Sequence, residues 1–112
     1  MPSASRGLKL TIFVNDDDVW HRKPLYHEIV RRARKSGIFR AIVIRGIEGY
    51  TGDGQIQTLR LLSLSDSMPL LVVIIDAEER VRNFLPQLSE LIDEGMATLS
   101  EVEIITYAPT SG

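Results

Sequence analysis

The residues best suited to chemistry lie in one short stretch, between positions 45 and 54. It contains four of the chain's eight glycines together with Arg, Glu, Tyr and Asp side chains, and it separates two apolar runs, 41–44 and 70–75. Glycine allows positive φ and close approach of the backbone to a ligand. A guanidinium can hold a phosphate through two parallel hydrogen bonds. The stretch is too long for a two-residue hairpin turn, so it predicts a binding loop between two strands.

Six residues of this loop are candidates for ligand binding: Arg45, Gly46, Glu48, Gly49, Tyr50 and Gly52. The arginine could contact a phosphate, or it could pair with one of three carboxylates, Glu48, Asp66 or Asp76. The tyrosine could stack on a base, contact a partner or pack on its own loop. The glycines could bring backbone amides to an anion or could simply permit flexibility. The loop lacks the Gly-Lys-Ser/Thr ending of a P-loop, and no helix follows it directly.

Other polar clusters give weaker signals. His21 and His27 lie near the aspartates 16–18, but we expect no metal site, because His27 falls outside the inward stripe of a predicted helix. The aspartates are interpreted as a solvated strand end, and the basic run 31–35 as an exposed helix face. No serine has the context of a nucleophile elbow, and no catalytic set is recognisable. We therefore predict a protein that is not an enzyme.

Composition restricts the class of protein. A chain of 112 residues is expected to form one domain, with an ordered core over about 8–107 and frayed ends at 1–7 and 108–112. The absence of cysteine excludes thiol catalysis, disulfides and thiolate metal sites, and it fits a cytoplasmic protein. Residues 1–7 do not resemble a signal peptide, and the apolar run 70–75 is too short to span a bilayer. We expect no membrane insertion.

Hydrophobic periodicity predicts four strands and two helices. Strands are expected over residues 8–15, about 39–45, 70–75 and 99–107. The first helix should begin near Pro24 and end before Gly37, a suitable C′ residue. Its inward stripe, with a spacing of four, comprises Leu25, Ile29 and Ala33.

The second helix has clearer boundary signals. Asp76 is expected to cap it, with Glu79 three residues later as the reciprocal partner, and Gly95 is expected to end it. Pro86 falls inside the helix, where it removes a hydrogen bond, so we expect a kink or a break. The core stripe comprises Val81, Phe84, Leu85, Leu88, Leu91 and Ile92.

The element order βαββαβ predicts an α+β protein with the ferredoxin-like fold, a four-stranded antiparallel sheet with both helices on one face. The third strand is apolar on both faces, because its two alternating sets are equally hydrophobic: Leu70, Val72 and Ile74, and Leu71, Val73 and Ile75. Leaving three such side chains in water would forgo about 1.5–3 kcal/mol each. A second copy of the chain is the simplest cover, so we expect a homo-oligomer. The alternative is that a terminal tail covers the sheet.

Several motifs together resemble those of the PII-like family known as DUF190, a domain of unknown function related to the PII nitrogen-regulatory signalling proteins. They extend over about 8–107 and comprise WHRKPLY (20–26), RGIEGY (45–50), LSDSMP (64–69), Asp76 after the third strand, and EGMATL (94–99). PII proteins are trimers of ferredoxin-like subunits whose sheets face the threefold axis. The resemblance therefore implies a PII-like homotrimer.

The resemblance also implies a regulatory function. In PII proteins the long loop after the second strand, the T-loop, contacts target proteins and helps to bind an effector, usually an adenine nucleotide, between subunits. Its equivalent here runs from about 46 to 62, with Arg45 at its base. Residues 93–98, where PII proteins have a lysine-rich phosphate loop, are acidic and contain no Lys or Arg. AMP or ADP is therefore expected in preference to ATP, and the implied partner is a regulatory target protein such as a membrane transporter.

Two other functions remain as alternatives. One is an enzyme that acts on a small molecule in the same intersubunit cleft, with His21 as its general acid or base. The other is RNA binding, because RNA-recognition domains share the βαββαβ order and stack bases on aromatic residues of the two central strands. The predicted third strand has no aromatic residue, the first has only Phe13, and the net charge is −2. Nucleic acid is therefore not an expected partner.

Overall fold

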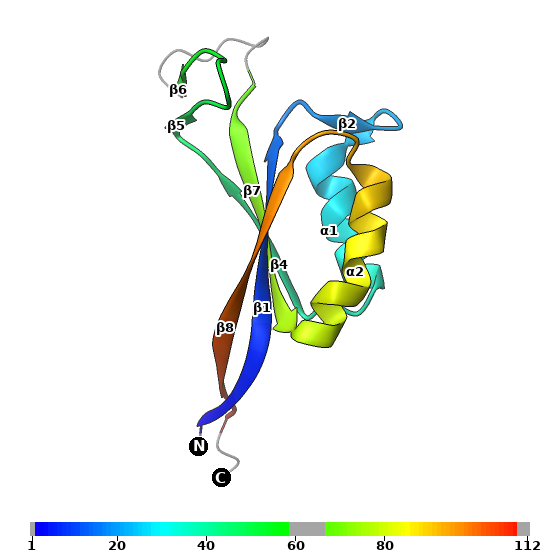
Figure 1. Ribbon diagram of the computed structural model, residues 1–112, viewed down its shortest axis with the longest axis vertical. Helices are drawn as coiled ribbons and strands as arrows, with labels where there is room; N and C mark the ends of the chain where they lie inside the picture. The colour runs from blue at the N-terminus through cyan, green and yellow to red at the C-terminus, as the bar shows by residue number, and fades with distance from the viewer. Residues whose placement is uncertain (1, 59–66, 110–112) are drawn as a thin grey trace.

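The computed structural model describes residues 2–58 and 67–109. In chain order its elements are β1 (Pro2–Asn15), β2 (Val19–Trp20), β3 (Lys23–Pro24), α1 (Leu25–Lys35), β4 (Arg40–Arg45), β5 (Glu48–Gly49), β6 (Gln57–Thr58), β7 (Pro69–Ala77), α2 (Glu78–Leu91) and β8 (Met96–Tyr107). The four long strands form an antiparallel sheet in the order β4-β7-β1-β8, and both helices lie on one face of it (Figure 1). The predicted ferredoxin-like fold is confirmed.

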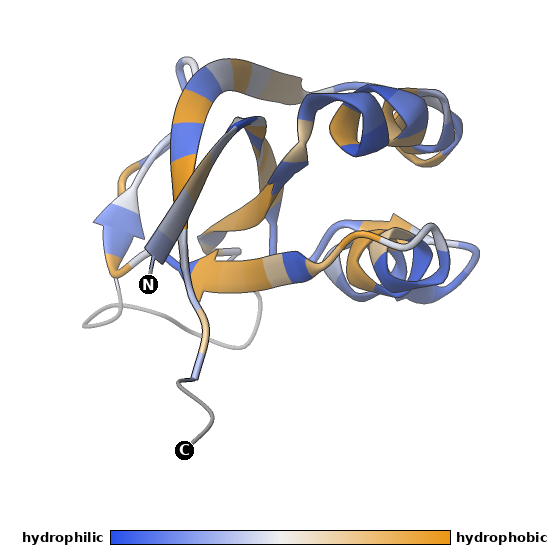
Figure 2. Cartoon of the chain, turned by 90° about the horizontal axis from the view of Figure 1, so that it is seen from below, coloured by the Kyte–Doolittle hydropathy of each residue, from blue (hydrophilic) through white to orange (hydrophobic). Residues whose placement is uncertain are grey.

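The core lies between the sheet and the two helices. Alternate residues of the central strands β1 and β7 are buried there: Leu8, Leu10, Ile12, Val14, Leu70, Val72 and Ile74. The period-two pattern predicted this for β1, whereas β7, apolar on both faces, gave no prediction of its buried face. The helices bury the predicted stripe of α1 and most of the predicted stripe of α2: Leu25, Ile29, Ala33, Val81, Phe84, Leu88 and Leu91. Leu85 and Ile92 are only partly buried, at the margin of this core. Figure 2 shows the same arrangement, with the strands of the sheet on one side, where orange apolar segments alternate with blue polar ones, and the two helices on the other.

The strand β1 begins six residues earlier than predicted, at Pro2 instead of Leu8. Residues 2–6 pair with residues 103–107 of β8 and continue the β1–β8 pair beyond the end of β7 as a two-stranded ribbon (Figure 1). The expectation that residues 2–7 are frayed is therefore wrong, because their backbone pairs with β8.

Gly7 lies where this ribbon leaves the sheet. A Cβ atom at this position would come within 2.5 Å of the carbonyl oxygen of Asp76 and closer still to the side chain of Ile104. Such a distance is far inside van der Waals contact, so the close packing of β7 and β8 around β1 requires glycine here.

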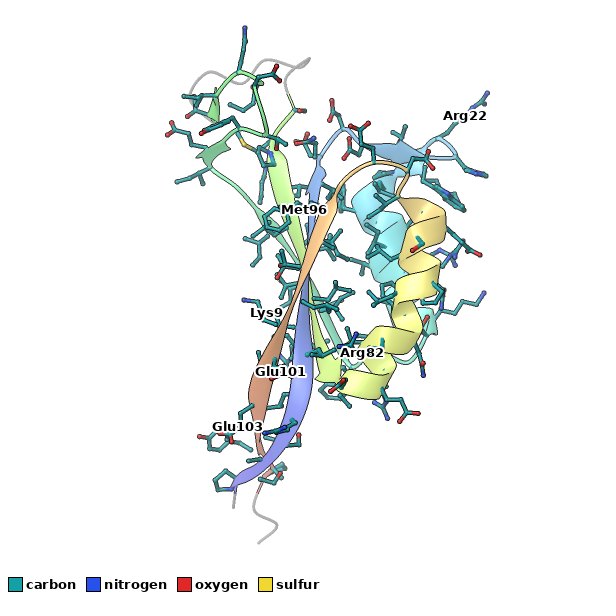
Figure 3. The ribbon with its side chains drawn as sticks, in the orientation of Figure 1. Lys9, Arg22, Arg82, Met96, Glu101 and Glu103 are labelled. Carbon is teal, nitrogen blue, oxygen red and sulfur yellow. The ribbon has the colours of Figure 1, made fainter. Side chains whose placement is uncertain are left out.

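The first helix has the predicted boundaries. Pro24 occupies its N-cap position, and Gly37 follows its end with a φ of 86°. The small β2–β3 hairpin before it was not predicted. Its turn holds two non-glycine residues at positive φ, His21 at 49° and Arg22 at 68°, and Arg22 projects from its tip (Figure 3).

The predicted capping box of α2 is wrong. Asp76 belongs to β7, and no side chain caps the helix. The Asp76 carboxylate instead accepts hydrogen bonds from the backbone N–H groups of Phe39 at 2.8 Å and Ala77 at 2.7 Å. Because Phe39 immediately precedes β4, this carboxylate fixes the start of that edge strand against β7.

The end of α2 and its proline also differ from expectation. The helix ends at Leu91, and Gly95 lies in the connection to β8. Pro86 lies inside an uninterrupted helix, so the predicted break is absent. Pro86 is exposed, as is Arg82 one turn earlier. The carbonyl that loses its hydrogen bond is therefore on the solvent side of the helix, where water can replace it.

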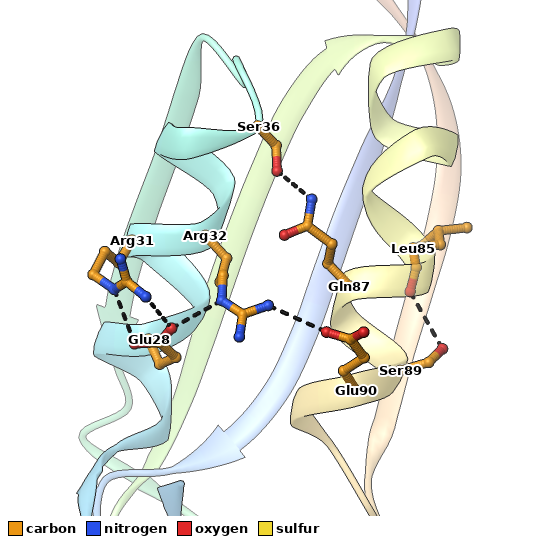
Figure 4. Close-up of polar contacts among 8 residues, drawn as sticks. All are labelled: Glu28, Arg31, Arg32, Ser36, Leu85, Gln87, Ser89 and Glu90. Atoms are coloured by element: carbon orange, nitrogen blue, oxygen red, sulfur yellow. Dashed lines mark hydrogen bonds and ion pairs between the residues drawn. The ribbon is translucent and has the colours of Figure 1, made fainter. Parts of the chain in front are cut away.

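Glu28 is a fully buried carboxylate that periodicity did not identify. It accepts two hydrogen bonds from Arg31, at 2.7 and 3.0 Å, and one from Arg32 at 3.0 Å (Figure 4). Arg32 also contacts Glu90 of α2 at 3.3 Å, so the network joins the two helices. The expectation of an exposed basic face is therefore wrong for Arg32. The hydrogen bond from Arg31 is the main reason that the pKa of Glu28 falls to about 2 despite burial.

Glu28→Gln is expected to lower the free energy of unfolding by about 1–3 kcal/mol at pH 7, because both arginines lose their charged acceptor. The pKa of Glu28 is depressed in the folded protein, so its contribution to stability is present above about pH 4.5 and is lost as the pH falls toward 2. Urea unfolding of wild type and variant at a series of pH values measures this effect. The difference between them should shrink through that window.

Glu78→Gln is the matched control. Glu78 makes an exposed ion pair with Arg82 at 3.1 Å, also on a helix. Its loss should cost less than about 0.5 kcal/mol, because exposed pairs of this kind are weak. Equal losses in the two variants would contradict the structural role assigned to Glu28.

Candidate functional site

The candidate site lies at the edge of the sheet where the predicted loop is attached. The strand register pairs Asn15 with Pro69 and Arg45 with Leu70. It therefore brings together the end of β1, the end of β4 and the start of β7. The loop between β4 and β7 extends from this edge and carries the short β5–β6 hairpin (Figure 1).

Arg45 ends β4 with 56% of its side chain exposed. Its Nη2 atom donates a hydrogen bond to Oδ2 of Asp16 at 3.0 Å. Of the three predicted partners, neither Glu48 nor Asp76 pairs with it within the described residues, and Asp66 lies outside them. The partner, Asp16, immediately follows β1, and the fold brings its side chain to the end of β4.

Asp16 is the centre of the contacts at this edge. Its Oδ1 atom accepts a hydrogen bond from the backbone N–H of Met68 at 3.0 Å, and its own N–H donates to the Met68 carbonyl at 2.9 Å. Asp18, two residues later, accepts a hydrogen bond from the N–H of Asn15 at 2.9 Å. The interpretation of residues 16–18 as a solvated strand end is therefore wrong for Asp16 and Asp18, which order the turn.

The glycines of the site approach Pro69. The N–H of Gly46 donates to the Pro69 carbonyl at 2.9 Å, and a Cβ atom at position 46 would lie 3.1 Å from that same oxygen. Gly49 also lies near Pro69: a Cβ atom at position 49 would be 3.5 Å from the Cγ atom of Pro69. Gly52 has a φ of 60°, which favours glycine. These residues shape the loop backbone.

The other two candidates lie on the outer part of the loop. Glu48 belongs to β5 and is exposed, and Tyr50 follows it with 62% of its surface exposed. The structure therefore places Arg45, Gly46 and Gly49 at the base of the loop. Among the described residues, no hydrogen bond or ion pair joins Glu48, Tyr50 or Gly52 to Arg45. Sequence reasoning missed Asp16 and Met68, because each is joined to the site only through the fold.

The face of the sheet opposite the helices carries exposed apolar side chains beside polar ones such as Lys9, and the described residues do not cover it. Phe13, Ile42, Ile44 and Met96 are 40–57% exposed on it. The register pairs Phe13 with Met96, and Met96 and Lys9 project away from the helices (Figure 3). The N-terminal residues do not cover this face, since they form the ribbon with β8. The alternative of an N-terminal tail folded over the sheet is therefore wrong.

Two hollows of the surface lie away from the loop. An open cavity of about 410 Å³ lies between α1 and the start of β4, and one of about 180 Å³ lies between the end of α2 and the start of β8. None of the six candidate residues lines either cavity. Neither of these two hollows therefore includes the described residues at the base of the loop.

His21 occupies the hairpin before α1. Its ring stacks on Trp20 with centroids 4.0 Å apart, and the guanidinium of Arg32 lies 5.3 Å from the Trp20 ring centre. Across the described ranges, no three His, Cys, Asp or Glu side chains gather in a way that could hold a metal ion. In the same ranges, no helix is both long enough and apolar enough to cross a membrane.

Known structures share this architecture. CPII from Thiomonas intermedia K12, described as a nitrogen regulatory PII-like protein and solved bound to ADP, AMP and bicarbonate, aligns with a TM-score of 0.62 at 13% identity, over 93% of this chain and 91% of its own. A protein from Thermus thermophilus, described as a putative PII-like signaling protein, aligns with a TM-score of 0.59 at 13% identity, over 92% and 91%. At such low identity the likeness concerns the fold, which is that of the PII-like proteins.

Sequence comparison defines the family more narrowly. The profile of DUF190, described as "Uncharacterized ACR, COG1993", matches residues 7–104. A UPF0166 protein of Aquifex aeolicus (strain VF5) is 36% identical over 96 residues, which span 86% of this chain and 90% of that protein. A UPF0166 protein of Methanocaldococcus jannaschii is 27% identical over 96 residues, spanning 85% and 88%. The chain belongs to the DUF190 family, as its motifs indicated.

The two members of the loop-base ion pair should contribute unequally to stability. Arg45→Ala should lower the free energy of unfolding by less than about 1 kcal/mol, because the pair is exposed. Asp16→Ala should cost about 1–3 kcal/mol, since it also leaves the buried Met68 N–H without its acceptor. Urea unfolding of both variants measures the two losses. A larger loss for Arg45→Ala than for Asp16→Ala would contradict the assignment of Asp16 as the centre of these contacts.

Proposed function

We propose that this protein is a PII-like regulatory trimer that binds a small anionic effector, an adenine nucleotide, between subunits and engages a target protein through loop 46–62. The observation that carries the proposal is the position of Arg45. It is a half-exposed guanidinium at the base of an exposed glycine-rich loop, in a chain with the PII-like fold. Arg45 is the cation, and Gly46 and Gly49 are the close-approach residues, of the proposed site.

The trimer is supported by the uncovered sheet face. The helices cover one face only, and the other presents Phe13, Ile42, Ile44 and Met96 to solvent. Burying such side chains against other copies would contribute about 25 cal/mol for each Å² of apolar surface removed from water. Assembly through this face would place the loop base of one subunit beside its neighbour and convert an open surface into a cleft.

The choice of nucleotide follows from charge. CPII, a structural neighbour, was solved with ADP and AMP. In this chain residues 93–98 contain Asp93 and Glu94, both exposed, and no Lys or Arg. An acidic segment near the bound phosphates would disfavour a triphosphate by like-charge repulsion. AMP or ADP is therefore the proposed effector, in preference to ATP.

The outer loop is the proposed contact with the target. Ile47, Tyr50 and Ile56 are 62–72% exposed there, although they are side chains that proteins commonly bury. Effector binding can influence the target only if the effector has different affinities for two states of the loop. The proposed target is a regulated protein such as a membrane transporter, reached from the cytoplasm, and the proposed role is not enzymatic.

Isothermal titration with AMP, ADP and ATP tests the nucleotide assignment. Saturable binding of AMP or ADP near one ligand per subunit is expected, with Arg45→Ala weakening it at least about tenfold, as for loss of a charged hydrogen bond. Arg22→Ala is the matched control, because Arg22 projects from the β2–β3 hairpin and should leave affinity unchanged. Absence of binding in wild type would refute the nucleotide assignment. Turnover of bound nucleotide would favour the enzyme alternative, with His21 the first residue to replace.

Analytical ultracentrifugation tests the assembly. Wild type should sediment as a trimer, and Ile44→Asp should dissociate it, because a carboxylate would be buried among the apolar side chains of the proposed interface. Val19→Asp is the matched control, since Val19 is 68% exposed on β2, away from the open face. A monomeric wild type, or a trimer that survives Ile44→Asp, would show that this face is not the interface.

A further inference from the structure

One carboxylate holds both ends of the binding loop. Asp16 contacts Arg45, the residue just before the loop, through Oδ2, and it contacts Met68, near the loop's end, through Oδ1, each at 3.0 Å. Its backbone N–H adds a third contact, to the Met68 carbonyl at 2.9 Å. Arg45 and Met68 are far apart in the chain, and the link between them runs through a residue of a different strand end.

The contact between Asp16 and Arg45 is one in which a bound anion could replace Asp16. It uses one guanidinium nitrogen, and 56% of the arginine side chain remains exposed. Exposed ion pairs are weak, and a phosphate or carboxylate that takes both arms of the guanidinium is a better acceptor than one carboxylate oxygen. By contrast, Asp16 contacts Met68 through two hydrogen bonds, one from each side of the pair, and the Met68 side chain is fully buried.

We propose that Asp16 competes with the bound anion for Arg45 and so couples occupancy of the site to the way the two loop ends are held. This inference rests on the proposed function of the loop base as an anion site. When an anion takes Arg45, Asp16 keeps Met68 but loses its hold on the residue before the loop. Asp16 is thus a positioning residue. Arg45 either binds the anion or holds the start of the loop to Asp16, but it does not do both.

The proximity of Asp16 to Arg45 also makes the proposed site prefer ligands of lower negative charge. An anion on Arg45 lies within a few ångströms of the Asp16 carboxylate, and repulsion between them grows with the charge of the ligand. Asp16 therefore selects against the most highly charged ligands, which agrees in direction with the acidic segment 93–98. Removing the Asp16 charge should raise affinity for every anion, and most for the one with the highest charge.

The decisive variant is Asp16→Asn. It keeps the size of the side chain and an oxygen that can accept the Met68 N–H, but it removes the charge that holds Arg45. Affinity for AMP, measured by titration, should rise about 1.5- to 5-fold, which corresponds to the strength of an exposed ion pair. Asp17→Asn is the control, because it makes the same charge change at the next, exposed position and should alter affinity less. A purely structural role for Asp16 predicts unchanged or weaker binding, which would overturn the proposal.

Hydrogen exchange at the two loop ends gives a second readout. Saturating AMP should accelerate exchange of the Gly46 amide, next to Arg45, in wild type, while the Met68 amide keeps its acceptor and its rate. Asp16→Asn should show no such acceleration, because its contact with Arg45 is already absent. If AMP binds wild type without this difference, the competition is refuted while the nucleotide site stands. If AMP binds no variant, the nucleotide assignment fails, and inorganic phosphate becomes the probe. Faster exchange with phosphate in wild type alone would support the competition, and no change would overturn it.

Discussion

The structure depends on one constraint: two helices can cover only one face of a four-stranded sheet whose central strand β7 is apolar on both. The covered face forms the core with Leu70, Val72 and Ile74. The opposite face leaves the intervening residues of β7 only half-buried and the flanking residues Ile42 and Ile44 about half exposed. The hydrophobic effect therefore folds the chain on one face, and on the other it would favour the proposed assembly. The position of the loop beside a neighbouring subunit would follow from that assembly.

Two carboxylates show how burial decides the role of a charge. Glu28 is enclosed and held by two arginines of its own helix, so its charge is satisfied permanently and serves the packing of α1 against α2. Asp16 is partly open to solvent, and its arginine partner lies on another strand and is half exposed. The buried Glu28 network is therefore hard to break, whereas the half-exposed Asp16–Arg45 pair is easy to break. Functional exchange of partners is therefore expected at Asp16.

The PII-like fold is retained at 13% identity, which indicates that the pattern of apolar residues carries the architecture. Because the architecture depends on apolar residues, the charges of the loop and of the strand ends can differ from one protein of this fold to another. The acidic segment with Asp93 and Glu94 and the Asp16–Arg45 pair are features of this kind. Function in this fold must therefore be argued from its charged groups at the sheet edge, since the shared architecture alone does not define a ligand.

The sequence by itself determined the element order, the buried faces and the two-sided apolar strand, because periods of two and 3.6 follow directly from backbone geometry. It singled out Arg45 and the glycine-rich loop as candidates, because glycines and charged side chains concentrate there. It did not determine that Asp76 fixes Phe39 instead of capping α2, that residues 2–7 pair with β8, or that Asp16 joins Arg45 to Met68. Those contacts join residues far apart in the chain, and only the tertiary structure decides which polar groups become neighbours.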